Sequence, residues 1–204
     1  MNLYDNQYYF IHRSFDQKNL PSLNAHLKTQ GREYYVTPPQ PFSAPLFFIN
    51  GSRNLQKQYG YPIMKIPPDI LFNGYNMVIP TAIREALIEY DLPHLNMHPT
   101  VYIHDDGEWH EGLWYITFTE YFDCWDKSAS NYDRDDPPIN GDYLVYDFSI
   151  DQKLFDQIPL EKRLLFKVGA TSTPYIVAHE KLVKKIFSKG YTGITITKVA
   201  DGTP

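Results

Sequence analysis

The amino-acid sequence predicts an α+β fold in which mostly antiparallel strands pack with two or three helices. Segments in which apolar and polar residues alternate outnumber the longer segments with helical spacing of apolar residues. An Asp-Gly pair (Asp106-Gly107) between two apolar segments is typical of an antiparallel hairpin. The chain has 204 residues, of which 43% are hydrophobic and 21% charged, as in one large globular domain or two small ones.

Residues 1–64 form a region rich in tyrosine and proline. Within it, residues 8–11 predict a strand, and residues 20–30 predict a short helix because leucines recur on one helical face. The prolines exclude helix interiors and central strands, so the segments around them are expected to be extended connections. We expect an α+β domain over residues 65–199, with one continuous domain as the alternative.

A weak internal repeat relates residues 76–99 to residues 175–198, which align without a gap when the chain is shifted by 99 positions. Both segments begin with apolar residues, continue with apolar residues three to five apart and end in alternation. This order predicts strand, helix and strand in each copy. Because Val78 and Val177 are the only identical pair, convergent patterning is the alternative to duplication.

The repeat also predicts where the two helices begin and end. Pro80 fits the first turn of the first helix, where its missing N–H costs little, and Gly190 ends the second. Further strands are expected near residues 100–104, 113–119, 143–148 and 163–168. The apolar residues of both copies are expected to fill one shared core: Val78, Ile83, Leu87, Val177, Leu182 and Ile186.

Charge is unevenly distributed along the chain. Residues 105–142 hold 2 Lys or Arg and 11 Asp or Glu, whereas residues 151–198 hold 9 and 4. The formal net charge is −5, which argues against a nucleic-acid partner because such proteins neutralise phosphates with cationic side chains. A solvated acidic surface is the simplest interpretation of residues 105–142, and a partner-binding surface is the alternative.

The sequence contains none of the common catalytic or cofactor motifs. It lacks the Gly-x-Ser-x-Gly nucleophile turn, the Gly-x-x-x-x-Gly-Lys phosphate loop and the Gly-x-Gly-x-x-Gly dinucleotide motif. Cys124 lies among aromatic and acidic residues, which raise the pKa of a thiol, so we expect a structural cysteine. The sequence therefore predicts no enzyme and no cofactor.

Two segments are weak candidates for metal binding. His104 and His110 flank the expected hairpin turn and could approach each other as zinc ligands. Residues 131–142 space oxygen ligands like a calcium loop, but Asp136 stands where that loop needs glycine. Polar strand ends and a solvated acidic loop are the simpler interpretations, and we expect no metal.

Neither a membrane-spanning segment nor a signal peptide is expected. Apolar runs last only a few residues, as at residues 46–49, whereas a spanning helix needs about 20. Residues 1–7 show neither the basic nor the apolar region of a signal peptide. The single cysteine cannot close an intrachain disulfide, which suits a reducing compartment. We therefore expect a cytoplasmic protein without a membrane partner.

Several segments carry motifs of a known family. Residues 163–177 form an apolar pair of strands, residues 180–182 (Glu-Lys-Leu) start a helix, and residues 190–194 follow a Gly-x-x-Gly ending. Together with residues 121–128 and 68–87, they resemble a bacterial immunity-protein family found beside polymorphic toxins in secretion-system cassettes. The family was long described as a domain of unknown function, and the resemblance covers residues 65–199.

The resemblance implies a non-catalytic immunity protein that binds and neutralises a cognate secreted toxin in the cytoplasm, as in interbacterial competition by type VI secretion. The alternatives are a ligand- or peptide-binding module and a small hydrolase with an unrecognised site. For an immunity protein, residues 105–142 are expected to face a toxin with a basic active-site cleft, because opposite charges speed association. The expected partner-binding residues are Asp105, Asp106, Glu108, Trp109, Glu111, Asp123, Trp125, Asp126, Tyr132, Asp133, Asp135 and Asp136.

Overall fold

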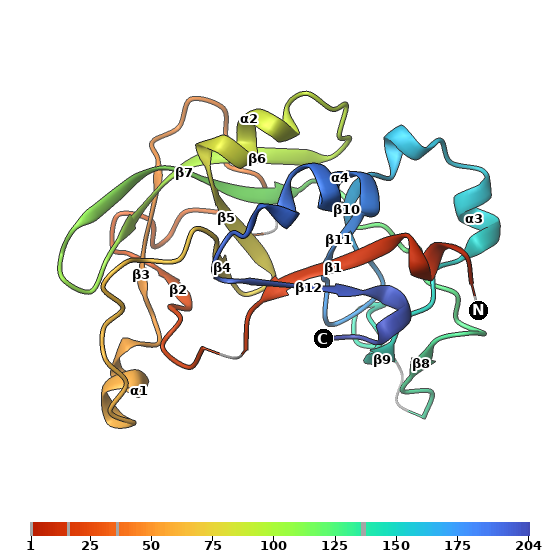
Figure 1. Cartoon of the computed structure of the whole chain (residues 1–204), viewed down its shortest axis with the longest axis horizontal. Helices are drawn as coiled ribbons and strands as arrows, with labels where there is room; N and C mark the ends of the chain where they lie inside the picture. The colour runs from red at the N-terminus through yellow and green to blue at the C-terminus, as the bar shows by residue number, and fades with distance from the viewer. Residues whose placement is uncertain (1, 16, 36, 136–137) are drawn as a thin grey trace.

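The computed structural model describes residues 2–15, 17–35, 37–135 and 138–204, and it has the predicted α+β fold with mostly antiparallel strands (Figure 1). Two larger sheets and one small sheet carry short helices. Among the described residues, no helix is both long and apolar enough to cross a membrane.

The six-stranded sheet has the order β2-β3-β6-β7-β5-β4. Its strands are β2 (Leu23–Ala25), β3 (Leu46–Asn50), β4 (Leu71–Asn73), β5 (Asn76–Pro80), β6 (Leu95–Ile103) and β7 (Trp109–Phe118). All neighbours pair antiparallel except β3 and β6, which are parallel. An isolated bridge between Ser22 and Phe72 joins the two edges. The sheet therefore nearly closes into a barrel, with Phe48, Tyr102 and Tyr115 in its core.

The four-stranded sheet has the order β10-β11-β1-β12 and is antiparallel throughout. Its strands are β1 (Tyr8–Arg13), β10 (Leu165–Lys167), β11 (Ile176–His179) and β12 (Ile194–Lys198). The N-terminal strand β1 thus lies between two C-terminal strands. On one of its faces Phe10 packs in an aromatic cluster with Trp125 and Phe155, and on the other Ile11 joins the main core.

The helices are short. They are α1 (Arg53–Gln58), α2 (Thr81–Leu87), α3 (Gln152–Asp156) and α4 (Glu180–Lys185), with 3-10 turns at Tyr4–Asn6, Leu160–Lys162, Phe187–Lys189 and Val199–Asp201. Helix α2 contacts β5 and β7, whereas α4 contacts β11 and β1. His179 caps α4, because its Nδ1 accepts a hydrogen bond from the backbone N–H of Lys181 at 3.2 Å. Gly190, with φ 82°, ends the turn that follows α4, as predicted.

Both segments of the sequence repeat fold as strand, helix and strand: β5-α2-β6 and β11-α4-β12. In each unit a further strand lies between the two, β7 in the first and β1 in the second. Ile83, Leu87, Leu182 and Ile186 meet in one core, as expected. Val78 and Val177 lie outside this core, because the side chain of Val78 packs inside the barrel and that of Val177 packs in the aromatic cluster. A common origin by duplication stays a prediction.

The prediction of a helix over residues 20–30 is wrong. Leu23 lies in β2 and is buried, whereas Leu27 is 77% exposed in a turn. Pairing of β2 with β3 supplies backbone hydrogen bonds that helical spacing of leucines alone does not outweigh. Pro80 was expected inside the first turn of α2, but it ends β5 and precedes the helix.

The N-terminal region does not form a separate layer. β1 pairs with β11 and β12, and β3 pairs with β6. Residues 1–64 and 65–199 therefore contribute strands to the same two sheets, and the division of the chain into domains stays a prediction. The small sheet of β8 (Asn131–Tyr132) and β9 (Val145–Asp147) lies beside the aromatic cluster.

A buried lysine joins the two larger sheets. Lys167 of β10 is 0% exposed, and its Nζ donates hydrogen bonds to Asn76 Oδ1 at 2.5 Å and to Tyr121 Oη at 3.4 Å. Asn76 Nδ2 in turn donates to Tyr115 Oη at 2.8 Å, which donates to Asn73 Oδ1 at 3.2 Å. Among the described residues no carboxylate pairs with this amine. Burial therefore lowers the pKa of Lys167 to about 8.

Truncation of the shared core should destabilise the protein strongly. Leu87→Ala and Ile186→Ala each remove a side chain that is at most 1% exposed, so each should lower the free energy of unfolding by about 2–5 kcal/mol. Leu27→Ala, at an exposed position, should change it by about 0.5 kcal/mol or less. Urea unfolding measures the free energy of unfolding of all three variants. Equal losses of stability in the three would contradict the packing of the two helices in one core.

The buried amine of Lys167 should make stability rise with pH. Its pKa falls from 10.5 to about 8 on folding, so between these values the unfolded chain binds more protons than the folded one. Stability should therefore rise across this window by up to about 1.4 kcal/mol per pH unit. Lys167→Met should flatten the rise. Urea midpoints of both chains between about pH 7.5 and 9.5 test this, and parallel pH curves would refute it.

Candidate functional site

The residues expected to bind a partner lie at two ends of the molecule. The β6–β7 hairpin carries residues 105–111 at one end of the long axis, whereas residues 123–135 lie around β8 toward the other end (Figure 1). Asp136 lies outside the described residues. The acidic segment is therefore continuous in sequence but contributes to two separate surfaces.

Trp109 is the exposed aromatic residue of the hairpin end. Its side chain is 48% exposed and packs against Phe47, with ring centroids 5.6 Å apart. Lys28 Nζ lies 4.5 Å from the Trp109 centroid and 4.8 Å from that of Phe47. The strand register places Ile103 opposite Trp109 and Ile49 opposite Ile103. These side chains consequently share the outer face of the sheet and form an apolar strip.

Four carboxylates border this strip. Asp105 Oδ2 accepts a hydrogen bond from Asn50 Nδ2 at 2.9 Å, and Asp106 Oδ1 accepts one from the backbone N–H of Glu108 at 2.9 Å. Glu108 and Glu111 are exposed and form no ion pair with another described residue. The strip and the carboxylates together are called the hairpin surface: Phe47, Ile49, Ile103, Asp105, Asp106, Glu108, Trp109 and Glu111.

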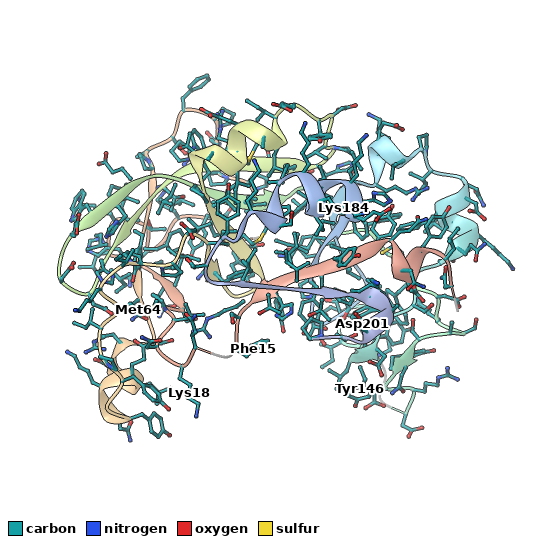
Figure 2. All side chains as sticks on the ribbon, viewed as in Figure 1. Phe15, Lys18, Met64, Tyr146, Lys184 and Asp201 are labelled. Carbon is teal, nitrogen blue, oxygen red and sulfur yellow. The ribbon has the colours of Figure 1, made fainter. Side chains whose placement is uncertain are left out.

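Buried polar contacts hold the hairpin in place. Gly107 adopts φ 93° in the turn, and its N–H donates to the carbonyl of His104 at 2.9 Å. The buried His104 donates from Nε2 to the carbonyl of Met64 at 2.8 Å, a residue labelled in Figure 2. The contact between Asn50 and Asp105 adds a link to β3. The exposed strip therefore rests on a rigid support rather than on a loose loop.

His104 and His110 approach each other, as predicted, with ring centroids 5.8 Å apart. His110 Nε2 is buried without a hydrogen-bond partner, and Asp106 Oδ2 lies 3.9 Å from His104 Nε2. Within the described part of the chain, no three His, Cys, Asp or Glu side chains are arranged to hold a metal ion. Two imidazoles alone do not complete the four-coordinate shell that zinc prefers.

At the opposite end, Trp125 is not available as a surface anchor. It is 4% exposed, and its indole N–H donates to the carbonyl of Gly169 at 3.2 Å. Tyr132 and Tyr143 pack edge-on against its ring, at 5.1 and 5.8 Å. The sequence pattern identified an aromatic residue in an acidic segment but did not reveal that the aromatic cluster encloses it.

The acidic residues at this end form local contacts. Asp126 accepts hydrogen bonds from the hydroxyl and backbone N–H of Ser128, which hold the pKa of its carboxyl below the usual range. Asp133 Oδ1 accepts a hydrogen bond from the N–H of Asp135, and Asp123 lies 3.7 Å from Lys127. These contacts stabilise turns of a surface loop.

Cys124 is buried, as predicted. Burial and the nearby carboxylate of Asp123 raise the pKa of its thiol well above the ordinary value. The neutral thiol packs in the aromatic cluster and is not an activated nucleophile.

The arrangement closest to a catalytic constellation was not predicted from the sequence. His94 has φ 64°. Its Nδ1 lies 3.3 Å from Thr119 Oγ1, and its Nε2 lies 3.6 Å from Glu120 Oε2. His94 and Glu120 border a cavity of about 340 Å³ that also contacts Lys162. The Thr119–His94 contact is solvent-exposed, and its 3.3 Å is long for a nucleophile–base pair.

In a comparison with known families, the immunity protein family Imm11 matches residues 27–201 of the chain. No protein of established annotation shows a significant match. The matched segment includes the hairpin surface and most strands of both larger sheets.

Trp109 and Trp125 should lose stability to different extents when truncated. Trp125→Ala empties a buried aromatic site and should lower the free energy of unfolding by about 3–5 kcal/mol. Trp109→Ala removes an exposed ring and should lower it by about 1 kcal/mol or less. Urea unfolding of both variants tests this contrast. A larger loss for Trp109→Ala would show that Trp109 serves the fold rather than a surface.

Proposed function

Because the chain belongs to the Imm11 immunity protein family, we propose that it binds one cognate secreted bacterial toxin and neutralises it by occlusion. The encounter takes place in the cytoplasm of a cell exposed to toxin delivered by type VI secretion during interbacterial competition. The protein acts by binding and not by catalysis, in keeping with a Cys124 thiol that is buried and has a raised pKa.

The hairpin surface is the proposed toxin-facing surface. The observation that supports it is an exposed tryptophan, Trp109, fixed by Phe47 and Lys28 on a supported sheet and bordered by carboxylates. Interface anchors are enriched in Trp, Tyr and Arg and are surrounded by polar residues. Of the three tryptophans in the acidic segment, Trp125 is buried, Trp114 is half-buried, and Trp109 is the one classed as exposed.

The charge of this surface suits a toxin with a basic active-site cleft. Glu108 and Glu111 form no ion pair with a described cationic residue, so their negative charge is exposed to the solvent. Toxins that act on nucleic acids, nucleotides or anionic cofactors carry cationic clefts, which an acidic plug attracts and fills. Rim charges mainly accelerate encounter, whereas the aromatic anchor slows dissociation.

Co-expression tests the proposed function. The toxin domain encoded by the gene next to that of this chain is produced in a bacterial host with and without the chain. Growth is expected only with the chain, and purified toxin domain should bind it in isothermal titration calorimetry. Growth arrest in both cases, with no heat of binding, would reject the proposal.

Substitutions at the hairpin surface should change the two rates of toxin binding differently. Trp109→Ala should speed dissociation by about 30-fold, the effect of losing an anchor worth about 2 kcal/mol. Glu108→Lys combined with Glu111→Lys should slow association about tenfold at low salt and flatten its salt dependence. Surface plasmon resonance measures both rates.

The control for the charge reversal is Asp135→Lys combined with Asp142→Lys. It changes the net charge equally, but at the opposite end of the molecule, and should leave association within about twofold of the wild type. Equal slowing by both pairs would assign the effect to net charge. Unchanged rates for all hairpin variants would exclude the hairpin surface from the interface.

A further inference from the structure

Strand β12 leaves its outer edge open from Ile194 onward. Just before it, the backbone N–H of Ile70 donates to the carbonyl of Thr192 at 3.1 Å, so residues 69–70 cover the start of this edge. In the six-stranded sheet the edges approach each other through the bridge between Ser22 and Phe72. In the four-stranded sheet, Phe122 covers the outer edge of β10, because its N–H donates to the carbonyl of Lys167 and its carbonyl accepts from Gly169. β12 pairs with β1 alone. Among the described strands of the two larger sheets, it is the longest one with an unpaired side.

The ladder identifies which backbone groups face outward. The N–H of Ser14 donates to the carbonyl of Gly193 at 3.1 Å, so these two residues form a hydrogen-bonded pair. Hydrogen-bonded and non-hydrogen-bonded pairs alternate along an antiparallel ladder. Thr195 and Thr197 therefore turn their backbone groups toward β1. Ile194 and Ile196 turn theirs outward, and no hydrogen bond from another described residue reaches them.

This edge lacks the features that usually protect edge strands. Natural edges are shortened, bulged or interrupted by proline and charged residues. β12 pairs with β1 in regular register over five residues. Residues 194–197 read Ile-Thr-Ile-Thr, and the one charged residue, Lys198, stands at the end of the strand. The edge is therefore chemically suited to accept another strand.

Figure 1 shows β12 on the lower side of β1, while α1 and the β8–β9 region extend lower on either side. In Figure 2, Phe15 and Lys18 are labelled toward one end of β12, and Asp201 and Tyr146 toward the other. Among the described strands, none pairs with the outer side of β12.

We infer that an extended segment of the cognate toxin adds to β12 as a fifth strand of the sheet. This inference rests on the proposed function and adds a second contact to the hairpin surface. Main-chain hydrogen bonds to Ile194 and Ile196 supply affinity, as in other cases of strand addition. On one face the segment meets Ile194 and Ile196, which pack on the main core, and on the other it meets Thr195 and Thr197. Its side chains should therefore alternate between apolar and small polar.

Amide hydrogen exchange followed by NMR tests the inference without any substitution. In the free chain, the amides of Ile194 and Ile196 should exchange fast, whereas those of Thr195 and Thr197, bonded to β1, should be protected. Saturation with the toxin domain encoded by the neighbouring gene should slow exchange at Ile196 by about tenfold or more. Thr195 and Thr197 serve as internal controls.

A proline substitution provides the second test. Ile196→Pro removes an outward N–H that β1 does not use, so the β1–β12 ladder keeps its hydrogen bonds. It should weaken toxin binding about tenfold or more, whereas Ile196→Val, which keeps the N–H, should bind like the wild type. Thermal unfolding checks that both variants are folded. If the proline variant is unfolded, the amide-exchange result alone decides the inference.

The outcomes separate this inference from the proposed function. A wild-type chain that does not bind the toxin domain overturns both. Binding with unchanged exchange at Ile196, or equal affinity of a folded Ile196→Pro variant, overturns strand addition alone. Protection of Ile194 and Ile196 that grows with the concentration of the free chain overturns it in favour of self-association.

Discussion

Insertion of β1 between β11 and β12 is the pairing on which the four-stranded sheet depends. β11 and β12 do not pair with each other, so without β1 neither has a neighbour on its inner side. β1 also supplies both faces of the sheet with core residues, Phe10 on one side and Ile11 on the other. Because the pairing joins the N-terminus to the last strands, the chain pays a large loop-closure entropy before these contacts form.

The second constraint is polar and lies where the two larger sheets meet. Lys167, Asn76, Tyr115 and Tyr121 are joined by hydrogen bonds, and no described carboxylate forms an ion pair with the amine. A buried amine is costly unless its donors are satisfied, so the sheets can be placed only where asparagine and tyrosine oxygens reach it. The network favours a single arrangement of the sheets, but it lowers the stability of the protein at pH values below the pKa of Lys167.

This scaffold suits the two recognition features that we propose, the hairpin surface and the edge of β12. The hairpin surface offers charge and an aromatic ring, which act on the rate of encounter and on the lifetime of a complex. The edge of β12 offers main-chain groups, which recognise an extended conformation more than a particular side chain. Both features lie on strands whose inner faces are buried, Tyr102 and His104 beneath the hairpin and Ile196 against the main core. Binding therefore needs little ordering of the protein, which lowers its entropic cost.

Local patterns in the sequence were enough to determine the fold class, the two strand–helix–strand units, the Asp-Gly hairpin and the burial of Cys124. Each of these follows from residue spacing or from the chemistry of neighbouring residues. The leucines of residues 20–30 were misleading, because pairing of β2 with β3 outweighs a weak helical preference. The tertiary structure alone decided that Trp125 is buried while Trp109 is exposed, since both lie in similar acidic and aromatic surroundings along the chain. It also decided that residues 105–142 divide between two ends of the molecule, and that β12 is left with an open edge. These properties depend on which distant strands pair, and hydrophobic periodicity carries no information about the partner of a strand.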